Sequence, residues 1–283
     1  MDRRRAVSAP DIAVVIGTYN RADALDAVLW ALSEQSEHGF EVIVADDGSG
    51  EEVADVVEGW SGAFPGRLHH VWQPDQGFRL ARAFDLAAMS ATADYLAFIP
   101  ADVIPRRHFV RALRRSARPG WFLAGRRLRL APSLTEVVLR ERLPVHRWSL
   151  PRWLAKRDGV EGLVSLTGRD RRRIGARDLP DFEPEGRAYV LTALWRADFG
   201  SVNGYDTRYV GWGEEDVDLA TRLRRLGLRC GHGGPHTTLV HLWHESREVV
   251  ERDNWWLLQE TELGDRVRAI SGVEELAREV ALS

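Results

Sequence analysis

The first 125 residues alternate between short apolar runs and stretches with helical periodicity. Apolar runs that suit buried strands are Ile12–Ile16, Glu41–Ala45, Leu68–Trp72, Tyr95–Ile99 and Trp121–Ala124. Helical patterns lie between them, at Leu25–Leu32, Glu51–Trp60, Leu80–Met89 and Arg106–Ala117. Such alternation is typical of parallel strands joined by right-handed helical crossovers. The sequence therefore predicts an α/β fold with a Rossmann-like, mostly parallel sheet flanked by helices.

Polar residues follow three of these predicted strands. They occupy the turns Gly17–Arg21, Asp46–Ser49 and Pro100–Asp102. Asn, Asp, Gly and Ser are ordinary turn residues, which explains each turn taken alone. Ligands of open parallel sheets, however, bind beyond the carboxyl ends of the strands. Three polar turns at one sheet edge therefore favour a shared site.

A cluster of carboxylates precedes a predicted helix at Gly211–Gly227. Leu219, Leu223 and Leu226 recur at helical spacing. Acidic residues occupy the start of this segment and arginines its end, which complements the helix macrodipole. Charge complementarity does not explain Trp212 between two glycines, whose ring suits stacking on a sugar. We expect at least one functional carboxylate here.

A carboxylate and two histidines suggest a metal site. Asp102 follows a predicted buried strand, and His241 and His244 lie near the end of the chain. A carboxylate, an imidazole and phosphate oxygens suit Mn²⁺ or Mg²⁺, whereas structural zinc requires more His or Cys ligands. If the histidine run is extended, only one of the two imidazoles faces the site.

Residues 126–187 interrupt the alternation. Arg126–Arg157 holds nine basic residues against two acids, together with Trp148 and Trp153. Two interpretations stay open: a solvated, irregular insertion, or a basic-aromatic surface for an anionic acceptor or a membrane. The tail from Glu248 to Leu282 has helical periodicity and predicts one or two packing helices.

Composition narrows the class of protein. The net charge of −3 argues against a general nucleic-acid binder. Cys230 is the single cysteine, which excludes an internal disulfide and favours a reducing compartment. Met1–Pro10 does not resemble a signal peptide, and no apolar run is long enough for a membrane helix. The sequence predicts a cytoplasmic protein, with peripheral membrane contact through residues 126–157 left open.

Several motifs resemble those of a known enzyme family. Val14–Arg21, Val42–Ser49 and Gln76–Ala83 follow one another as in the family 2 glycosyltransferases, which have the GT-A fold. Gly211–Leu223 resembles the C-terminal module of β-1,4-galactosyltransferases and polypeptide N-acetylgalactosaminyltransferases. The resemblance covers roughly residues 11–115 and 188–245. It implies a nucleotide-sugar-binding half (1–125), a variable insertion that could be an acceptor surface (126–187), a catalytic and acceptor half (188–245) and a helical tail (246–283).

The resemblance also implies roles for matching residues. Those expected at the nucleotide and donor are Thr18, Asn20, Arg21, Asp46, Asp47, Phe78, Arg79 and Arg82. Asp216 would be the general base and Glu215 the second catalytic carboxylate, which holds sugar hydroxyls. Trp212, Gly213 and Glu214 would bind sugar or acceptor. Asp102 and His244 would bind Mn²⁺ or Mg²⁺, with His241 as the weaker candidate.

Two positions depart from the family pattern. Pro100 replaces the first acid of the Asp-x-Asp metal motif, and proline cannot bind a metal through its side chain. Phe84 and Asp85 replace an Arg-Asn pair, which removes a cation expected near the donor.

The sequence therefore predicts an inverting, metal-dependent glycosyltransferase that moves a sugar from a UDP-sugar to a glycan, lipid-linked or small-molecule acceptor. One alternative is a catalytically weakened module of the same fold that binds a sugar nucleotide or a glycan, which Pro100 favours. Retention at the anomeric carbon is the weaker stereochemical alternative. A nucleotidyltransferase would require a Gly-rich phosphate loop and a lysine near the first strand, but Lys156 is the single lysine.

Overall fold

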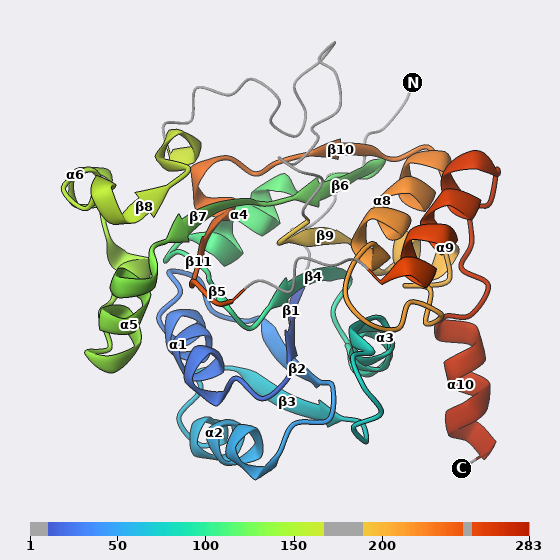
Figure 1. Ribbon diagram of the computed structural model, residues 1–283, viewed down its shortest axis with the longest axis horizontal. Helices are drawn as coiled ribbons and strands as arrows, with labels where there is room; N and C mark the ends of the chain where they lie inside the picture. The colour runs from blue at the N-terminus through green and yellow to red at the C-terminus, as the bar shows by residue number, and fades with distance from the viewer. Residues whose placement is uncertain (1–10, 167–188, 246–250, 283) are drawn as a thin grey trace, which may run out of the picture.

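The structure is a computed structural model, and it describes residues 11–166, 189–245 and 251–282. A seven-stranded sheet lies at its centre, in the order β10-β6-β9-β4-β1-β2-β3 (Figure 1). Its strands are β1 (Ile12–Thr18), β2 (Glu41–Asp46), β3 (Arg67–Trp72), β4 (Tyr95–Pro100), β6 (Trp121–Ala124), β9 (Thr192–Trp195) and β10 (Arg229–Gly231). All pairs are parallel except those of β9 with β4 and with β6. The predicted mostly parallel sheet is confirmed.

Helices cover both faces of this sheet. Successive strand residues point to opposite faces, and since the central strands are apolar at successive positions, both faces need to be covered. The helices are α1 (Ala22–Ser33), α2 (Glu51–Ser61), α3 (Leu80–Ser90), α4 (Phe109–Ser116), α5 (Pro132–Arg140), α6 (Leu150–Leu154), α7 (Arg196–Ser201), α8 (Glu215–Arg225), α9 (Arg252–Leu263) and α10 (Val273–Leu282). Short 3-10 turns lie at Val145–Arg147, Arg157–Gly159, Leu163–Leu166 and Pro235–Thr237. In the described ranges, every helix is too short or too polar to cross a bilayer.

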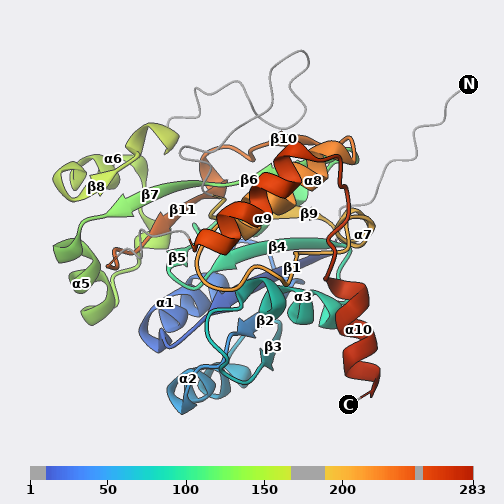
Figure 2. The same cartoon turned by 45° about the vertical axis from the view of Figure 1, so that its right-hand side comes forward.

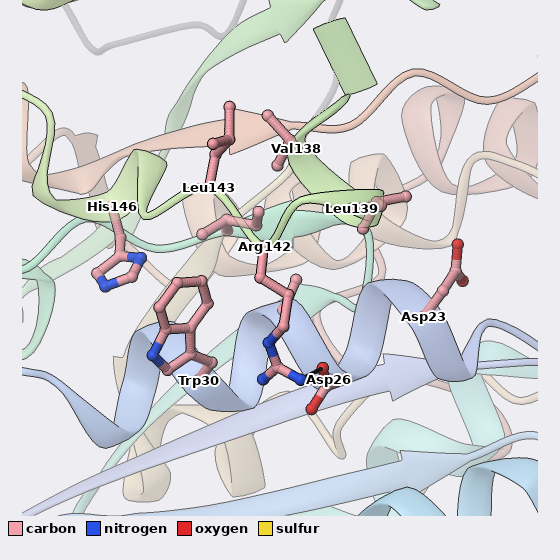
Figure 3. A pocket seen from close by; sticks show the side chains of 10 residues that line it. Asp23, Asp26, Trp30, Val138, Leu139, Arg142, Leu143 and His146 are labelled. Atoms are coloured by element: carbon pink, nitrogen blue, oxygen red, sulfur yellow. Dashed lines mark ion pairs between the residues drawn. The ribbon is translucent and has the colours of Figure 1, made fainter. Parts of the chain in front are cut away.

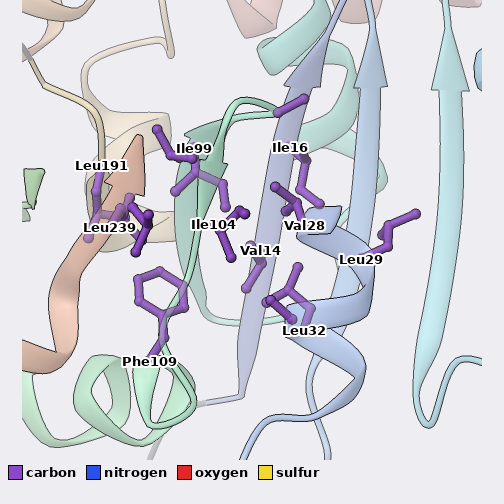
Figure 4. Packing of buried hydrophobic residues seen from close by; sticks show 14 of the residues in the cluster. Val14, Ile16, Val28, Leu29, Leu32, Ile99, Ile104, Phe109, Leu191 and Leu239 are labelled. Carbon is purple, nitrogen blue, oxygen red and sulfur yellow. The ribbon is translucent and has the colours of Figure 1, made fainter. Parts of the chain in front are cut away.

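Two buried apolar clusters hold the layers together. Val14 and Ile16 of β1 belong to the cluster that includes residues of α1, α2 and α4. Figure 4 shows this cluster, with Val28 and Leu32 of α1 and Phe109 of α4 pointing toward the strands. The intervening β1 residues face the second cluster, which contains residues of α3, α7 and α8. Burial on both faces explains why Ile12–Ile16 of β1 are all apolar.

One of the two open interpretations, a solvated and irregular insertion, does not hold for residues 126–166, the part of this segment that the structure describes. A second sheet has the order β5-β11-β7-β8, formed by β5 (Val103–Ile104), β11 (Thr238–His241), β7 (Arg126–Leu130) and β8 (Val160–Glu161). Trp148 and Trp153 are buried in the first apolar cluster. Residues 126–130 are ordered because β7 pairs with β11, more than 100 positions away, and sequence pattern does not reveal such a partner.

The C-terminal tail contains the two packing helices expected from its periodicity. Helix α9 lies across α8 (Figure 2), and Leu258 of α9 joins the second apolar cluster. Helix α10 packs near α3, where Glu279 accepts a 2.7 Å hydrogen bond from Arg82. The tail therefore supports the side of the sheet that carries α3 and α8.

Candidate active site

Three polar turns meet at one edge of the large sheet. The parallel register pairs Thr18 of β1 with Asp46 of β2, and Gly17 of β1 with Pro100 of β4. The residues that follow these strands therefore emerge side by side at the carboxyl edge, as predicted. This edge is where α/β sheets bind ligands.

Hydrogen bonds lock the turns after β1 and β2 together. The backbone N–H of Asn20 donates to the Ser49 hydroxyl at 2.9 Å, and Asn20 Oδ1 accepts from Gly50 N–H at 3.0 Å. Asn20 has a left-handed backbone (φ 50°), a conformation that Asn tolerates better than most residues. Asp46 is buried and accepts from Ser49 N–H and from His70 Nε2, both at 2.8 Å. Burial opposes the ionisation of Asp46, but these hydrogen bonds hold its pKa below the usual value.

Asp47 connects the same edge to the turn before α3. Its Oδ2 accepts the backbone N–H of Arg79 at 2.6 Å, and its Oδ1 accepts from Gln73 Nε2 at 2.5 Å. Gln73 in turn accepts a 2.6 Å hydrogen bond from Arg82. Burial raises the pKa of Asp47 despite these contacts. Asp46 and Asp47, which are expected to contact the nucleotide, therefore also hold in place the loops that are predicted to bind it.

Asp102, His241 and His244 form one cluster, in which the candidate ligand atoms lie within 4.8 Å of one another. Asp102 Oδ2 is 3.0 Å from His244 Nε2 and 3.6 Å from His241 Nε2. Burial opposes ionisation of Asp102, but the two imidazoles outweigh it and hold the pKa of this carboxyl far below its usual range. The hydrogen bond to Asp102 raises the pKa of His244.

Both histidines face Asp102, because the condition for only one of them to do so, an extended run from His241 to His244, is not met. Strand β11 ends at His241, and the residues after it are not in a strand, so the alternation of side chains stops there. The register pairs His241 with Val103, directly after Asp102, and Leu242 N–H donates to the Asp102 carbonyl at 2.9 Å. These contacts bring both imidazoles to one carboxylate. His241 is therefore a stronger candidate ligand than its spacing suggested.

The Gly-Trp-Gly loop is held by backbone contacts from two sides. Gly211 N–H donates to the Phe78 carbonyl at 2.8 Å, which joins this loop to the predicted donor loop. Buried Asn254 of α9 donates to the carbonyls of Gly211 and Gly213, at 3.3 and 3.0 Å. Gly211 has φ 82°, and an added Cβ would lie 2.3 Å from Glu251. Glycine is required at this position, and the indole of Trp212 stays 42% exposed.

Glu215 and Asp216 begin α8, and their carboxyl groups differ in hydrogen bonding. Asp216 accepts from the backbone N–H groups of Tyr189 at 3.0 Å and Val217 at 2.8 Å. Glu215 Oε2 is buried and has no hydrogen-bond partner in the described part of the chain. Burial raises the pKa of both carboxyls, and the charge of Asp216 raises that of Glu215 further. Backbone hydrogen bonds lower the pKa of both carboxyls, but the charge of Asp216 acts on Glu215, so Asp216 is the more readily ionised of the two.

Asp216 lies at the same sheet edge as the Asp102 cluster. Its partner Tyr189 precedes β9, which runs antiparallel to β4, so the start of β9 lies beside the end of β4. Among the described residues no hydrogen bond or ion pair joins Asp216 to the cluster directly. An open groove beside His244 is lined by Arg21, Glu136 and Trp243.

Another cavity lies away from this edge. It is enclosed between α1 and the segment around α5, where Arg142 forms a 3.0 Å ion pair with Asp26 (Figure 3). Its volume of about 20 Å³ suits a water molecule, not a sugar.

Sequence analysis missed one contributor to the site, Asn254, and did not anticipate that two substituted positions are buried. Asn254 lies in the tail, and only its buried side chain reveals that it clamps the Gly-Trp-Gly loop. Phe84 and Asp85, which replace the expected Arg-Asn pair, are buried, and Asp85 accepts from the backbone of Tyr205 at 2.9 Å. Burial raises the pKa of Asp85 well above its usual value. These two side chains are thus part of the support of the site.

Proteins that are similar in sequence to this chain are glycosyltransferases. The family model for glycosyl transferase family 2 matches residues 13–149, and the model described as the N-terminal domain of galactosyltransferase matches residues 176–244. Validoxylamine A glucosyltransferase of Streptomyces hygroscopicus subsp. jinggangensis (strain 5008) is 30% identical over 252 residues, which is 83% of this chain and 54% of that protein. Pre-mycofactocin glycosyltransferase of Mycobacterium tuberculosis (strain ATCC 25618 / H37Rv) is 32% identical over 229 residues, or 77% and 40% of the two chains. The chain thus spans about half the length of these curated relatives, or less.

Solved structures share the fold at lower identity. The mannosyltransferase PcManGT from Pyrobaculum calidifontis, in complex with GDP-Man and Mn²⁺, has a TM-score of 0.55 at 19% identity, over 85% of this chain and 59% of that one. S. aureus TarS 1–349 has a TM-score of 0.59 at 12% identity, over 96% and 72% of the two chains. These likenesses confirm the predicted GT-A fold.

Proposed function

The chain belongs to the family 2 glycosyltransferases, and from this premise we propose that it is an inverting, divalent-metal-dependent enzyme that moves a sugar from a UDP-sugar to an acceptor hydroxyl. The observation that carries the proposal is the cluster of Asp102, His241 and His244, at the same sheet edge as Asp216. A sheet edge with metal ligands on one side and a partly buried carboxyl pair on the other suits transfer from a diphosphate to a hydroxyl.

The side chains of the cluster fit a divalent cation. Asp102 Oδ1 is buried without a hydrogen-bond partner among the described residues, as expected of an oxygen that awaits a ligand. His244 Nδ1 lies 2.9 Å from the Glu245 carbonyl, and donation there would leave the lone pair of Nε2, the nitrogen that faces Asp102, to bind a metal. Two imidazoles and a carboxylate suit Mn²⁺ better than Mg²⁺, which prefers oxygen ligands. A bound cation would neutralise the charge that develops on the leaving diphosphate.

His241 can supply a side-chain ligand to the metal, which Pro100 cannot do. We expect His241→Asn to weaken Mn²⁺ binding by about 10- to 100-fold, because one of three protein ligands is lost. Titration calorimetry of the metal-free protein measures the affinity. His38→Asn is the control, because His38 is an exposed histidine outside the cluster. An unchanged Mn²⁺ affinity in His241→Asn would remove this residue from the ligand set.

The donor is proposed to lie across the interlocked loops of the carboxyl edge. The residues involved are Thr18, Asn20, Arg21, Asp46, Asp47, Phe78, Arg79 and Arg82. Each carboxylate oxygen of Asp46 and Asp47 can accept more than one hydrogen bond, so their internal contacts leave capacity for a base or a ribose. A TarS 1–349 structure contains UDP, which supports a uridine donor, whereas the mannosyltransferase structure contains GDP-Man.

Asp216 is proposed to be the general base. It accepts the proton of the acceptor hydroxyl as that oxygen attacks the anomeric carbon, and the bond from this carbon to the diphosphate breaks. Glu215, whose pKa is raised further, would stay protonated and hydrogen-bond a sugar hydroxyl. One base and in-line attack imply inversion; retention would require the acceptor oxygen to bond on the same face of the sugar from which the diphosphate leaves.

The raised pKa of Asp216 predicts an acid limb in the pH profile. A carboxyl with a raised pKa keeps its proton to higher pH, and a protonated base cannot accept another. We therefore expect kcat to fall as pH decreases, with a midpoint well above 3.8, the ordinary aspartate value. Stopped-time assays from pH 4 to 9, with thermal unfolding at each pH, check this. Full activity of the folded protein down to about pH 4 would contradict it.

The alternative function is a binding module that retains the fold but transfers no sugar, which Pro100 favours. A thermal-shift screen of UDP-, GDP- and dTDP-sugars, with and without Mn²⁺, followed by assays of nucleotide release, separates the two. Stabilisation without release, even with acceptors added, would support the binding module.

The cytoplasmic location stays a prediction, as does membrane contact through residues 126–157, for which the exposed Leu150 and Leu154 of α6 provide a small apolar face.

A further inference from the structure

Two tryptophans of α9 are exposed beside the Gly-Trp-Gly loop. Trp255 is 45% and Trp256 53% exposed, and their ring centroids lie 4.6 Å apart with an interplanar angle of 75°. The inner face of α9 is formed by the buried side chains of Asn254, Leu258 and Thr261, which are spaced as one helical face. The two indoles lie off this face. Neighbouring exposed aromatic rings of this size are typical of interaction sites.

Backbone contacts connect this pair to the proposed reaction centre. Glu251 N–H donates to the Trp212 carbonyl at 3.2 Å, and Trp255 N–H donates to the Glu251 carbonyl at 3.1 Å. Asn254, adjacent to Trp255, donates to the carbonyls on both sides of Trp212. The first turn of α9 and the loop before Glu215 and Asp216 therefore form one continuous surface (Figure 2 shows α9 lying across α8).

We propose that Trp255 and Trp256 bind the distal sugars of an oligosaccharide acceptor. This inference rests on the proposed function and adds the chemical class of the acceptor. The flat face of an indole packs against the C–H-rich face of a pyranose, and two rings at a steep angle can contact two successive sugar units. Arg252 and Asp253 are exposed one turn before Trp256, where they can hydrogen-bond hydroxyls. Charges of both signs around aromatic rings suit a neutral, hydroxyl-rich ligand.

The test measures binding of oligosaccharides without donor. The full-length protein is applied to an array of linear glucose, galactose and N-acetylglucosamine oligomers of two to six units, with the matching monosaccharides. We expect one series to bind more tightly as its length increases. The double variant Trp255→Ala/Trp256→Ala should lose about ten-fold or more in affinity, and Trp255→Phe/Trp256→Phe should recover most of it. Leu263→Ala is the control, an exposed apolar residue at the far end of α9.

Two results would overturn the inference. One is wild-type protein that binds no oligomer more tightly than its monosaccharide. The other is a double alanine variant with wild-type affinity; if that variant also sediments as a smaller species than wild type, the patch is a contact between two copies of the chain.

Hydrolysis of the donor without an acceptor tests the proposed function independently of acceptor binding. The double alanine variant should hydrolyse a UDP-sugar in the presence of Mn²⁺ at the wild-type rate, because both indoles lie outside the donor loops. Wild-type protein that neither hydrolyses nor is stabilised by any nucleotide sugar would contradict the proposed function, whatever the array shows.

Discussion

Replacing Asp216 with asparagine lowers glycosyl transfer by about 10²- to 10⁴-fold and leaves donor binding intact, because asparagine cannot accept the acceptor proton. The carboxylate of Asp216 is held by the backbone N–H groups of Tyr189 and Val217. The single side-chain oxygen of asparagine can satisfy only one of them, so we expect a modest decrease in melting temperature. Steady-state rates and UDP-induced thermal shifts measure the two effects.

The control for this variant is Glu260→Gln. Glu260 is an exposed carboxylate on α9 with one long ion pair, 3.8 Å to Arg208, so its loss should affect neither rate nor stability much. Two outcomes would remove Asp216 from the role of base. One is a rate near that of wild type, and the other is loss of the UDP-induced shift, which would place Asp216 at the donor instead.

Removing the divalent cation is expected to stop turnover, and Mn²⁺ should restore it. Within the described ranges, one buried oxygen of Asp102 has no hydrogen-bond partner, and both histidines approach its other oxygen. Asp102→Asn replaces this negative charge with a neutral amide, so we expect Mn²⁺ affinity to decrease by about 100-fold or more. Calorimetry of the metal-free protein gives the affinity, and turnover in a chelator gives the metal requirement.

Metal binding should also release protons. Asp102 raises the pKa of His244, so this imidazole keeps its proton to a higher pH than usual and must lose it to bind a cation. Calorimetry in buffers of different ionisation enthalpy measures this release. Full activity in excess chelator, or Mn²⁺ affinity unchanged in Asp102→Asn, would end the metal assignment.

The local sequence pattern is sufficient to predict the strands of the large sheet. Runs such as Ile12–Ile16 and Tyr95–Ile99 are apolar at every position, because strands buried on both faces need no polar side. The periodicity of Leu80–Met89 likewise matched α3 closely, since one buried stripe is enough to define a helix. The second sheet was not predicted. Its strands are short and pair across the chain, so their arginine-rich and histidine-containing sequences carry little strand signal.

In the candidate site, too, the sequence predicts some features and misses others. The rule that ligands bind at the carboxyl ends of parallel strands predicts that Asp102 and the turns after β1 and β2 lie together, and the register of the strands confirms it. His241 ranked below His244 because only His244 matches the family pattern, and the end of β11 at His241, which lets both imidazoles reach Asp102, has no clear signal in the sequence. Asn254 and the exposed pair Trp255 and Trp256 lie in a tail to which periodicity assigned only packing.

The sequence by itself determined the layered α/β architecture, the sheet edge that carries the polar turns, and the residue types available there. These follow from local periodicity and from the fixed direction of parallel strands. Only the tertiary structure decided which histidines meet Asp102, how α9 clamps the Gly-Trp-Gly loop, and how Glu215 and Asp216 differ in ionisation. Those properties depend on burial and on contacts between distant segments, which a linear pattern does not contain.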